Sequence, residues 1–144
     1  MEEIDFCWRA QLAGYRIRVE PRSTVFHVGG GTLPNNSPQK IYLNFRNNLC
    51  MLFKNLSPGT FWPVLFSRMV LDGMAALVFL VQGHPDFFKK VFRAHIDFHR
   101  QRKSLHEKRR AIQRHRVARP HGILRNSIIL LHAFGYRTFD KVMR

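Results

Sequence analysis

The sequence predicts an α/β fragment: an N-terminal helix and two short strands, followed by a mainly α-helical, basic C-terminal region. Apolar residues at helical spacing in the first dozen positions indicate the helix. Alternation of apolar and polar residues directly after it indicates a strand, and helical periodicity dominates the chain from about residue 40. We therefore expect two parts, residues 1–40 and residues 41–144.

The first part contains three expected elements. The helix covers residues 2–13, and Gly14 is placed to end it as a left-handed C-cap. The first strand covers residues 15–20, where Tyr, Ile and Val alternate with charged residues before a proline. The second covers residues 24–28 and leads into three glycines, whereas residues 33–39 form a polar loop.

The second part is a series of helices. Residues 41–55 form the first, and Pro58 with Gly59 breaks it. A long apolar helix over residues 61–81 and a strongly basic helix over residues 84–113 follow. A last apolar helix is expected after a break at Arg119, Pro120, His121 and Gly122, over residues 123–134.

The helix at residues 61–81 meets the length needed to cross a bilayer. However, Arg68 and Asp72 fall near its middle, four residues apart. Each charge at a bilayer centre costs roughly 2.5 to 3.5 kcal/mol. We therefore expect this helix to lie in the membrane interface or to pack on the domain, and a single transmembrane span remains the alternative.

The charge is concentrated in the C-terminal half. The chain carries a net charge of +15, and residues 84–144 hold sixteen Lys and Arg against four Asp and Glu. Such a surface favours an anionic partner. Phe residues on one side of the basic helix predict an anionic membrane surface rather than nucleic acid, because apolar helices flank the basic run and no stacking platform accompanies it. The predicted membrane-contacting residues are Lys89, Lys90, Arg93, Arg100, Arg102 and Lys103.

Other chemistries lack a pattern. Cys7 and Cys50 lie far apart, so neither a zinc ribbon nor a redox pair is indicated, and reduced thiols in a cytoplasmic protein are expected. His95 and His99 share a helix face without a third ligand. The N-terminus has no signal-peptide pattern.

Three of the nine acidic residues stand in the first five positions. The predicted helix begins with Glu2, Glu3 and Asp5, and the positive end of the helix dipole stabilises carboxylates at this position. An ion pair between Asp5 and Arg9 explains part of the cluster without any function. A site that needs a carboxylate base is the functional alternative.

These residues carry a resemblance. The run from Glu2 to Arg9, the Gly14-Tyr15-Arg16-Ile17 segment and the His27-Val28-Gly29-Gly30-Gly31-Thr32 segment resemble, in this order, the second half of the catalytic domain of family 2 glycosyltransferases. Residues 40–49 also resemble bacterial members. The family has a GT-A (Rossmann-like) fold and transfers a sugar from a nucleotide-sugar donor, so the resemblance implies that residues 1–40 derive from such a domain.

The resemblance implies roles for individual residues. Glu3 is the expected catalytic base, with Glu2 or Asp5 as alternatives, because the family's Glu-Asp pair is Glu-Glu here. Trp8 and Arg9 are candidates for acceptor or sugar binding, although core packing also accounts for the tryptophan. His27 is a candidate for metal or diphosphate contact, and a simple hydrogen-bonded histidine is the alternative. The complete enzyme is expected to use a divalent cation, Mg²⁺ or Mn²⁺.

The chain lacks an upstream nucleotide-binding region and an Asp-x-Asp motif. We therefore expect a C-terminal fragment of an inverting glycosyltransferase, inactive alone, in which a separate chain could carry the N-terminal half. The expected substrates are a nucleotide-sugar and a glycan or lipid-linked acceptor, in cell-surface polysaccharide synthesis. The expected location is the cytoplasmic face of the cell membrane. A small basic nucleic-acid-binding or membrane-anchored interaction protein is the alternative.

Overall fold

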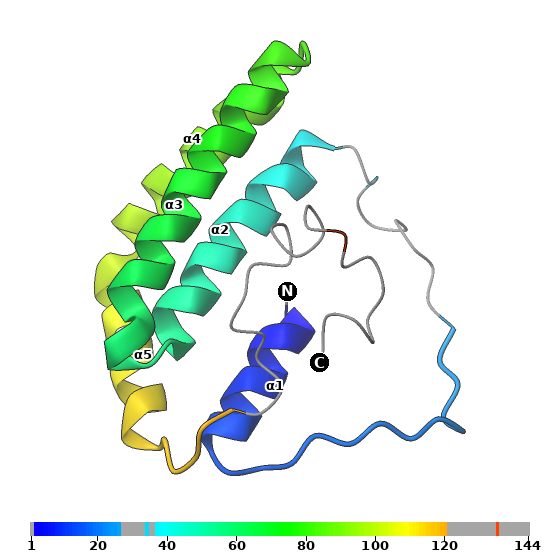
Figure 1. The fold of residues 1–144 in the computed structure, drawn as a ribbon, viewed down its shortest axis with the longest axis vertical. Helices are drawn as coiled ribbons and strands as arrows, with labels where there is room; N and C mark the ends of the chain where they lie inside the picture. Colours follow the sequence, from blue (N-terminus) through cyan, green and yellow to red (C-terminus); the bar gives the residue numbers. More distant parts are fainter. Residues whose placement is uncertain (1, 27–33, 35–36, 121–134, 136–144) are drawn as a thin grey trace.

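The computed structural model describes residues 2–26, 34, 37–120 and 135. Within these residues the fold consists of five α-helices: α1 (Glu2–Leu12), α2 (Pro38–Asn55), α3 (Pro58–Val81), α4 (Pro85–Arg100) and α5 (Arg102–Arg114). Figure 1 shows α2, α3 and α4 running alongside one another, with α1 near the end of α2. The described part of the chain is therefore all-helical.

The predicted α/β class is wrong for the described residues. Residues 15–20 have no regular secondary structure, and neither do residues 24–26, the described portion of the second predicted strand. Tyr15, Ile17 and Val19, the apolar side of the alternation, are all exposed. A strand requires a partner with which to pair its backbone groups, and no strand in the described chain offers one.

The N-terminal helix is confirmed together with its cap. Gly14 has φ +90°, and the amides of Gly14 and Tyr15 donate to the carbonyls of Gln11 and Ala10. This pair of bonds is the Schellman arrangement, which requires a left-handed residue at the glycine. The amide of Val117 then donates to the carbonyl of Leu12, so the segment after α5 contacts the end of α1.

Proline begins three of the helices. Pro38, Pro58 and Pro85 each occupy the first turn, where the missing amide hydrogen costs nothing. The hydroxyl of Ser37 accepts from the amide of Lys40, so α2 begins inside the segment predicted as a loop. The predicted break at Pro58 is instead the start of α3, directly after the break at residues 56 and 57.

The single helix predicted over residues 84–113 is two helices. They meet at Gln101, whose amide bonds to the carbonyls of Asp97 and Phe98. The bend lets α5 return over the end of α2, where Gln113 and Arg109 donate to the last carbonyls of that helix. The helix predicted at residues 123–134 lies outside the described residues.

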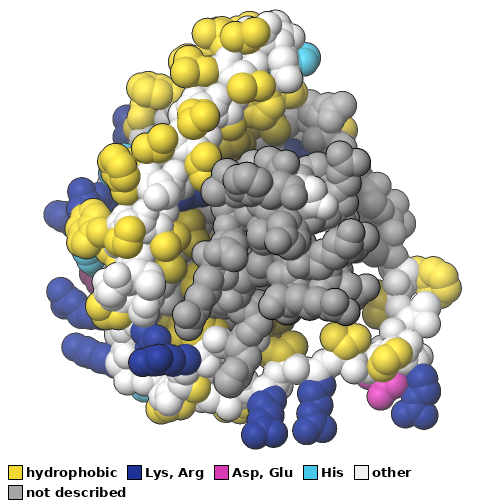
Figure 2. Space-filling model, viewed as in Figure 1, with side chains coloured by type: hydrophobic (Ala, Val, Ile, Leu, Met, Phe, Trp, Pro, Cys, Tyr) yellow, Lys and Arg dark blue, Asp and Glu magenta, His cyan; other side chains and the backbone are white. Residues whose placement is uncertain are grey.

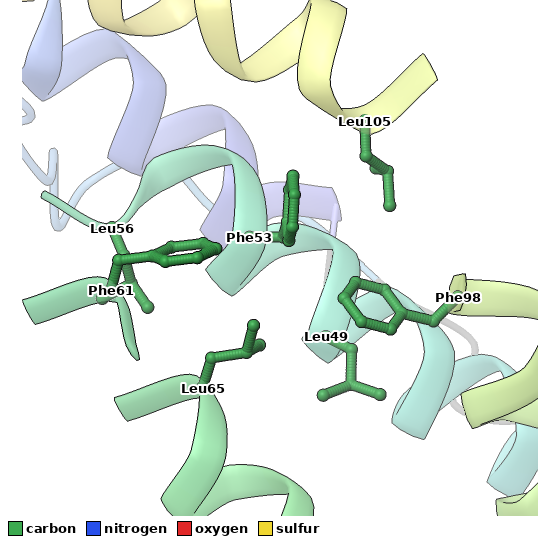
Figure 3. Close-up of a cluster of buried hydrophobic side chains, with 7 residues drawn as sticks. All are labelled: Leu49, Phe53, Leu56, Phe61, Leu65, Phe98 and Leu105. Atoms are coloured by element: carbon green, nitrogen blue, oxygen red, sulfur yellow. The ribbon is translucent and has the colours of Figure 1, made fainter. Parts of the chain in front are cut away.

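The core lies where α2, α3, α4 and α5 meet. Phe53 makes edge-to-face contacts with Phe61 and Phe98, with ring centroids 5.2 Å and 5.7 Å apart. Figure 3 shows these three rings among four leucines. The complete cluster is Leu49, Phe53, Leu56, Phe61, Leu65, Phe98 and Leu105.

Candidate functional site

The acidic first turn of α1 forms as the sequence predicts. Glu2 and Glu3 are exposed at the start of the helix, whereas Asp5 points toward the last turn of α2. Leu12 of α1 is buried and Trp8 packs against the core cluster, and Asp5 lies at the same contact with α2. The Asp5 carboxylate is therefore less exposed than those of the two glutamates.

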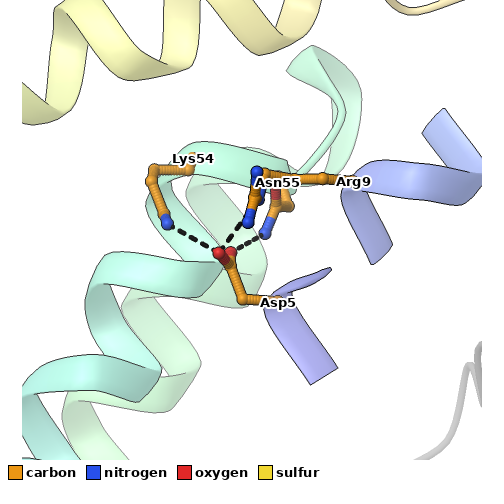
Figure 4. Close-up of polar contacts among 4 residues, drawn as sticks. All are labelled: Asp5, Arg9, Lys54 and Asn55. Carbon is orange, nitrogen blue, oxygen red and sulfur yellow. Dashed lines mark hydrogen bonds and ion pairs between the residues drawn. The ribbon is translucent and has the colours of Figure 1, made fainter. Parts of the chain in front are cut away.

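Asp5 is a packing anchor in this fold. Its carboxylate accepts hydrogen bonds from Arg9 Nε at 3.0 Å, Lys54 Nζ at 3.0 Å and Asn55 Nδ2 at 2.7 Å (Figure 4). Burial alone would raise the pKa of Asp5, but the bonds from Lys54 and Asn55 and the nearby positive charges outweigh it and hold the pKa below its usual value. A carboxylate held ionised in this way is a weak proton acceptor.

A small pocket of about 140 Å³ lies beside this anchor. Both Glu2 and Asp5 line it from α1, opposite Asn47, Cys50, Met51 and Lys54 of α2. Burial raises the pKa of the Cys50 thiol, so this cysteine is not an activated nucleophile. Of the three predicted base candidates, the structure brings Glu2 and Asp5 together at one cavity.

The predicted sugar-binding residues have contacts within the fold. Trp8 is half-buried and packs against the hydrophobic core cluster, and its indole nitrogen is buried without a hydrogen-bond partner in the described chain. Arg9 pairs with Asp5 four residues before it, as the simple interpretation predicts. His27 lies outside the described residues, so its predicted contact with metal or diphosphate stays a prediction.

The described residues do not fit a divalent cation by themselves. They contain no group of three His, Cys, Asp or Glu side chains close enough to hold a metal ion. The Asp5 carboxylate, which is the best placed of the acidic residues, already accepts from two cations and an amide. We therefore derive no step that uses a metal from this part of the chain.

The second notable feature is the outer surface of α3. This helix is long and apolar enough to cross a membrane by length and composition. It turns large apolar side chains outward along its whole length, from Trp62, 66% exposed, to Val81, 89% exposed. Figure 2 shows hydrophobic side chains gathered along α3. The exposed members are Trp62, Val64, Phe66, Val70, Leu71, Met74, Leu77, Val78, Leu80 and Val81.

Both charged residues of α3 lie on the side of the helix that packs on the molecule, with Asp72 buried and Arg68 half-buried. Asp72 is only 1% exposed and pairs with Arg68 Nη2 at 2.7 Å and His95 Nε2 at 3.2 Å. The Arg68 guanidinium also lies over the Phe45 ring, 5.6 Å from its centroid. The charges that counted against membrane contact are therefore absent from the outer face of the helix. The partner His95 belongs to another helix, so the sequence alone does not reveal this pairing.

The predicted membrane-contacting residues are distributed over two helices. Lys89, Arg93 and Arg100 are exposed on α4, whereas Lys90 is half-buried. Arg102 and Lys103 are exposed in the first turn of α5, beyond the bend at Gln101, which the sequence does not predict. Arg93 and Arg100 each lie 3.6 Å from Asp97, so part of this charge is neutralised internally.

Comparison of the chain with protein families, with curated proteins and with solved structures finds no match.

Proposed function

We propose that the chain attaches to an anionic membrane surface through α3, lying in the plane of the interface, as the C-terminal part of a family 2 glycosyltransferase. The observation that supports membrane attachment is the outer face of α3, which exposes large apolar side chains from Trp62 to Val81, while Arg68 and Asp72 pair on the inner side of the helix. Exposed apolar surfaces of this extent mark interaction sites.

The neighbour of α3 supports the in-plane orientation. Helix α4 runs antiparallel along it, because Phe87 contacts Phe79 near one end and His95 contacts Asp72 further along. A helix of this length spans roughly 36 Å, enough to cross the hydrocarbon layer. A crossing, however, would carry the exposed Lys89 of α4 into the hydrocarbon, where charges are costly. An in-plane helix leaves α4 in the headgroup region or water.

The basic residues supply the preference for anionic lipid. Lys and Arg near a membrane surface contribute about 1 kcal/mol each toward binding anionic lipids. Exposed cations on α4 and α5 include Lys89, Arg100, Arg102 and Lys103. Anionic lipids are abundant in the cytoplasmic leaflet, so we place the protein on the cytoplasmic face of the membrane.

The glycosyltransferase assignment is supported by the motif order and by the helix that opens at Glu2. In this proposal the exposed Glu2 and Glu3 face the acceptor, and Asp5 holds α1 on α2. The nucleotide, the Mg²⁺ or Mn²⁺ ion and most of its ligands belong to a nucleotide-binding half outside these 144 residues. Incubation of this chain alone with nucleotide-sugars is expected to give no transfer, and turnover would overturn this part of the proposal.

Vesicle binding tests the membrane part. The chain is expected to co-sediment with vesicles containing 30% phosphatidylglycerol and to bind neutral vesicles more weakly at equal lipid concentration. Alkaline carbonate is expected to release it, because an in-plane helix does not cross the bilayer. Failure to bind anionic vesicles, together with salt-sensitive binding to duplex or single-stranded nucleic acid, would favour the nucleic-acid alternative. Retention after carbonate treatment would favour a span.

A further inference from the structure

A second candidate site lies between α2 and α4, away from the acidic turn and from the outer face of α3. An open groove of about 410 Å³ is lined by Gln39, Tyr42 and Arg46 of α2 and by Lys90 and Arg93 of α4. Three of these five residues are cationic and none is acidic. Because α4 turns Phe87 and His95 toward α3, its residues Lys90 and Arg93 lie on another side of the helix.

Hydrogen bonds fix the floor of the groove. The Tyr42 hydroxyl donates to Asp97 Oδ2 at 2.9 Å and accepts from Arg46 Nη1 at 3.2 Å. Arg46 also donates from Nε and Nη2 to Asn47 Oδ1, at 3.1 Å and 2.9 Å. Within the described residues, these bonds occupy three of the five guanidinium N–H groups of Arg46. Nη1 and Nη2 therefore each keep one N–H group that can donate to a ligand. The arginine is therefore oriented before any ligand arrives.

The balance of charge in the groove is positive. Lys90 Nζ lies 6.0 Å from the centroid of the Tyr42 ring and makes no ion pair with any carboxylate of the described chain. Asp97 borders the groove, and the bond from Tyr42 lowers its pKa, with the charges of Arg93 and Arg100 acting in the same direction, so it stays ionised. Three cations, Arg46, Lys90 and Arg93, therefore line the groove, and Asp97 pairs with only the last of them.

From this arrangement we infer that the groove between α2 and α4 is a binding site for a phosphate monoester or diphosphate group. Cations gathered around one cavity repel one another unless an anion occupies it. A guanidinium with two N–H groups left matches phosphate oxygens, and a lysine adds a point charge. The surplus of cations over carboxylate suits a multiply charged anion better than a singly charged carboxylate or phosphodiester. This inference does not depend on the proposed glycosyltransferase function.

Two sources could supply the group, a soluble diphosphate or the phosphate monoester headgroup of a lipid. The site chemistry is the same for both, so the experiment separates them. The first measurement is calorimetric titration of the folded chain with inorganic pyrophosphate in metal-free buffer at low salt. The groove variant is the double substitution R46Q/K90Q, and the matched control is K103Q/R110Q, which removes the same charge from exposed positions on α5.

We expect pyrophosphate to bind the wild type and the control with affinities within about 3-fold of each other. It should bind the groove variant at least about 10-fold more weakly than the wild type, which is equivalent to about 1.4 kcal/mol. If R46Q/K90Q fails to give the helical circular dichroism spectrum of the wild type, K90Q alone replaces it, because Lys90 makes no ion pair with the described residues. Absence of pyrophosphate binding, or equal weakening in the groove variant and the control, would overturn the inference.

The second measurement compares vesicles containing phosphatidic acid with vesicles of equal charge containing phosphatidylglycerol. If the groove takes a lipid phosphate, the wild type prefers phosphatidic acid, K90Q loses this preference, and pyrophosphate displaces the wild type. If the wild type shows no preference but K90Q still weakens pyrophosphate binding, a soluble diphosphate is the ligand. Both results support the site and differ only in the source of the phosphate.

Discussion

Paired glutamine substitutions at Val70 and Leu71 distinguish an in-plane α3 from a transmembrane one. The two residues are neighbours in sequence and exposed to similar extents, 47% and 41%. In a span they would sit at nearly the same depth, so V70Q and L71Q would weaken membrane attachment equally. In an in-plane helix they differ by about 100° around the axis. Val70 points almost directly away from the buried Asp72 side, whereas Leu71 points sideways along the interface.

The expected loss at Val70 follows from its environment. Full burial of a valine is worth roughly 1.5 to 3 kcal/mol, and about half of this side chain is available to contact lipid, so its removal costs about 1 kcal/mol. Bringing an amide into the lipid boundary adds roughly 1 kcal/mol. The total of about 2 kcal/mol corresponds to binding about 30-fold weaker. L71Q is expected to weaken binding by about 2-fold, because its amide reaches the headgroups.

The assay is co-sedimentation with phosphatidylglycerol vesicles over a range of lipid concentrations. Glutamine is neutral, so neither substitution alters the attraction between the protein and anionic lipid. Circular dichroism of the bound proteins checks that α3 stays helical. Equal loss in V70Q and L71Q would refute the in-plane orientation, and no loss in either would refute α3 as the contact surface.

Three further predictions concern stability, each measured by urea unfolding in mild detergent. Because the pKa of Asp5 is lowered, its contribution is fully present above the unfolded pKa near 3.9 and is lost as pH falls through the folded pKa. D5N should therefore cost about 2 kcal/mol at pH 7 and progressively less as pH falls below about 3.9, and a gap independent of pH would contradict this. D72N should lower the free energy of unfolding by about 3 kcal/mol, because it leaves Arg68 without its partner, whereas R68M/D72L should recover most of this loss. A double variant as unstable as D72N would contradict this and show that the ion pair itself is stabilising. G14A should lower the free energy of unfolding by about 1 kcal/mol because Gly14 has a positive φ. G73A, with open space around the glycine, should raise the free energy of unfolding by at most about 1 kcal/mol, and equal effects of the two substitutions would refute the strain at Gly14.

Helix positions could be predicted from the sequence because periodicity, prolines and Gly14 are local signals. Prediction of strands failed for a reason that is not local. Alternation at residues 15–20 indicates only that one side could be buried against a sheet, and the described chain provides no sheet. The bend at Gln101 also escaped prediction, because the apolar periodicity of the two helices continues across it and no glycine or proline marks it.

The candidate site could be predicted only in part. Glu2 and Glu3 lie exposed at the start of a helix as their spacing indicates, and Asp5 does pair with Arg9. Its stronger involvement with Lys54 and Asn55 spans about fifty residues and has no sequence signature. The groove was also missed, although the four-residue spacing of Tyr42 and Arg46 on one helix face was a usable signal.

The connection between α1 and α3 bears on the acceptor of the proposed enzyme. Asp5 ties α1 to Lys54 and Asn55, in the last turn of α2, and α3 begins only three residues later, at Pro58. A membrane contact made through α3 therefore fixes the acidic turn near the N-terminal end of the membrane-bound helix. An acceptor that reaches Glu2 and Glu3 in this geometry must be presented close to the lipid surface. Within the proposed function, this favours a lipid-linked acceptor over a glycan free in solution.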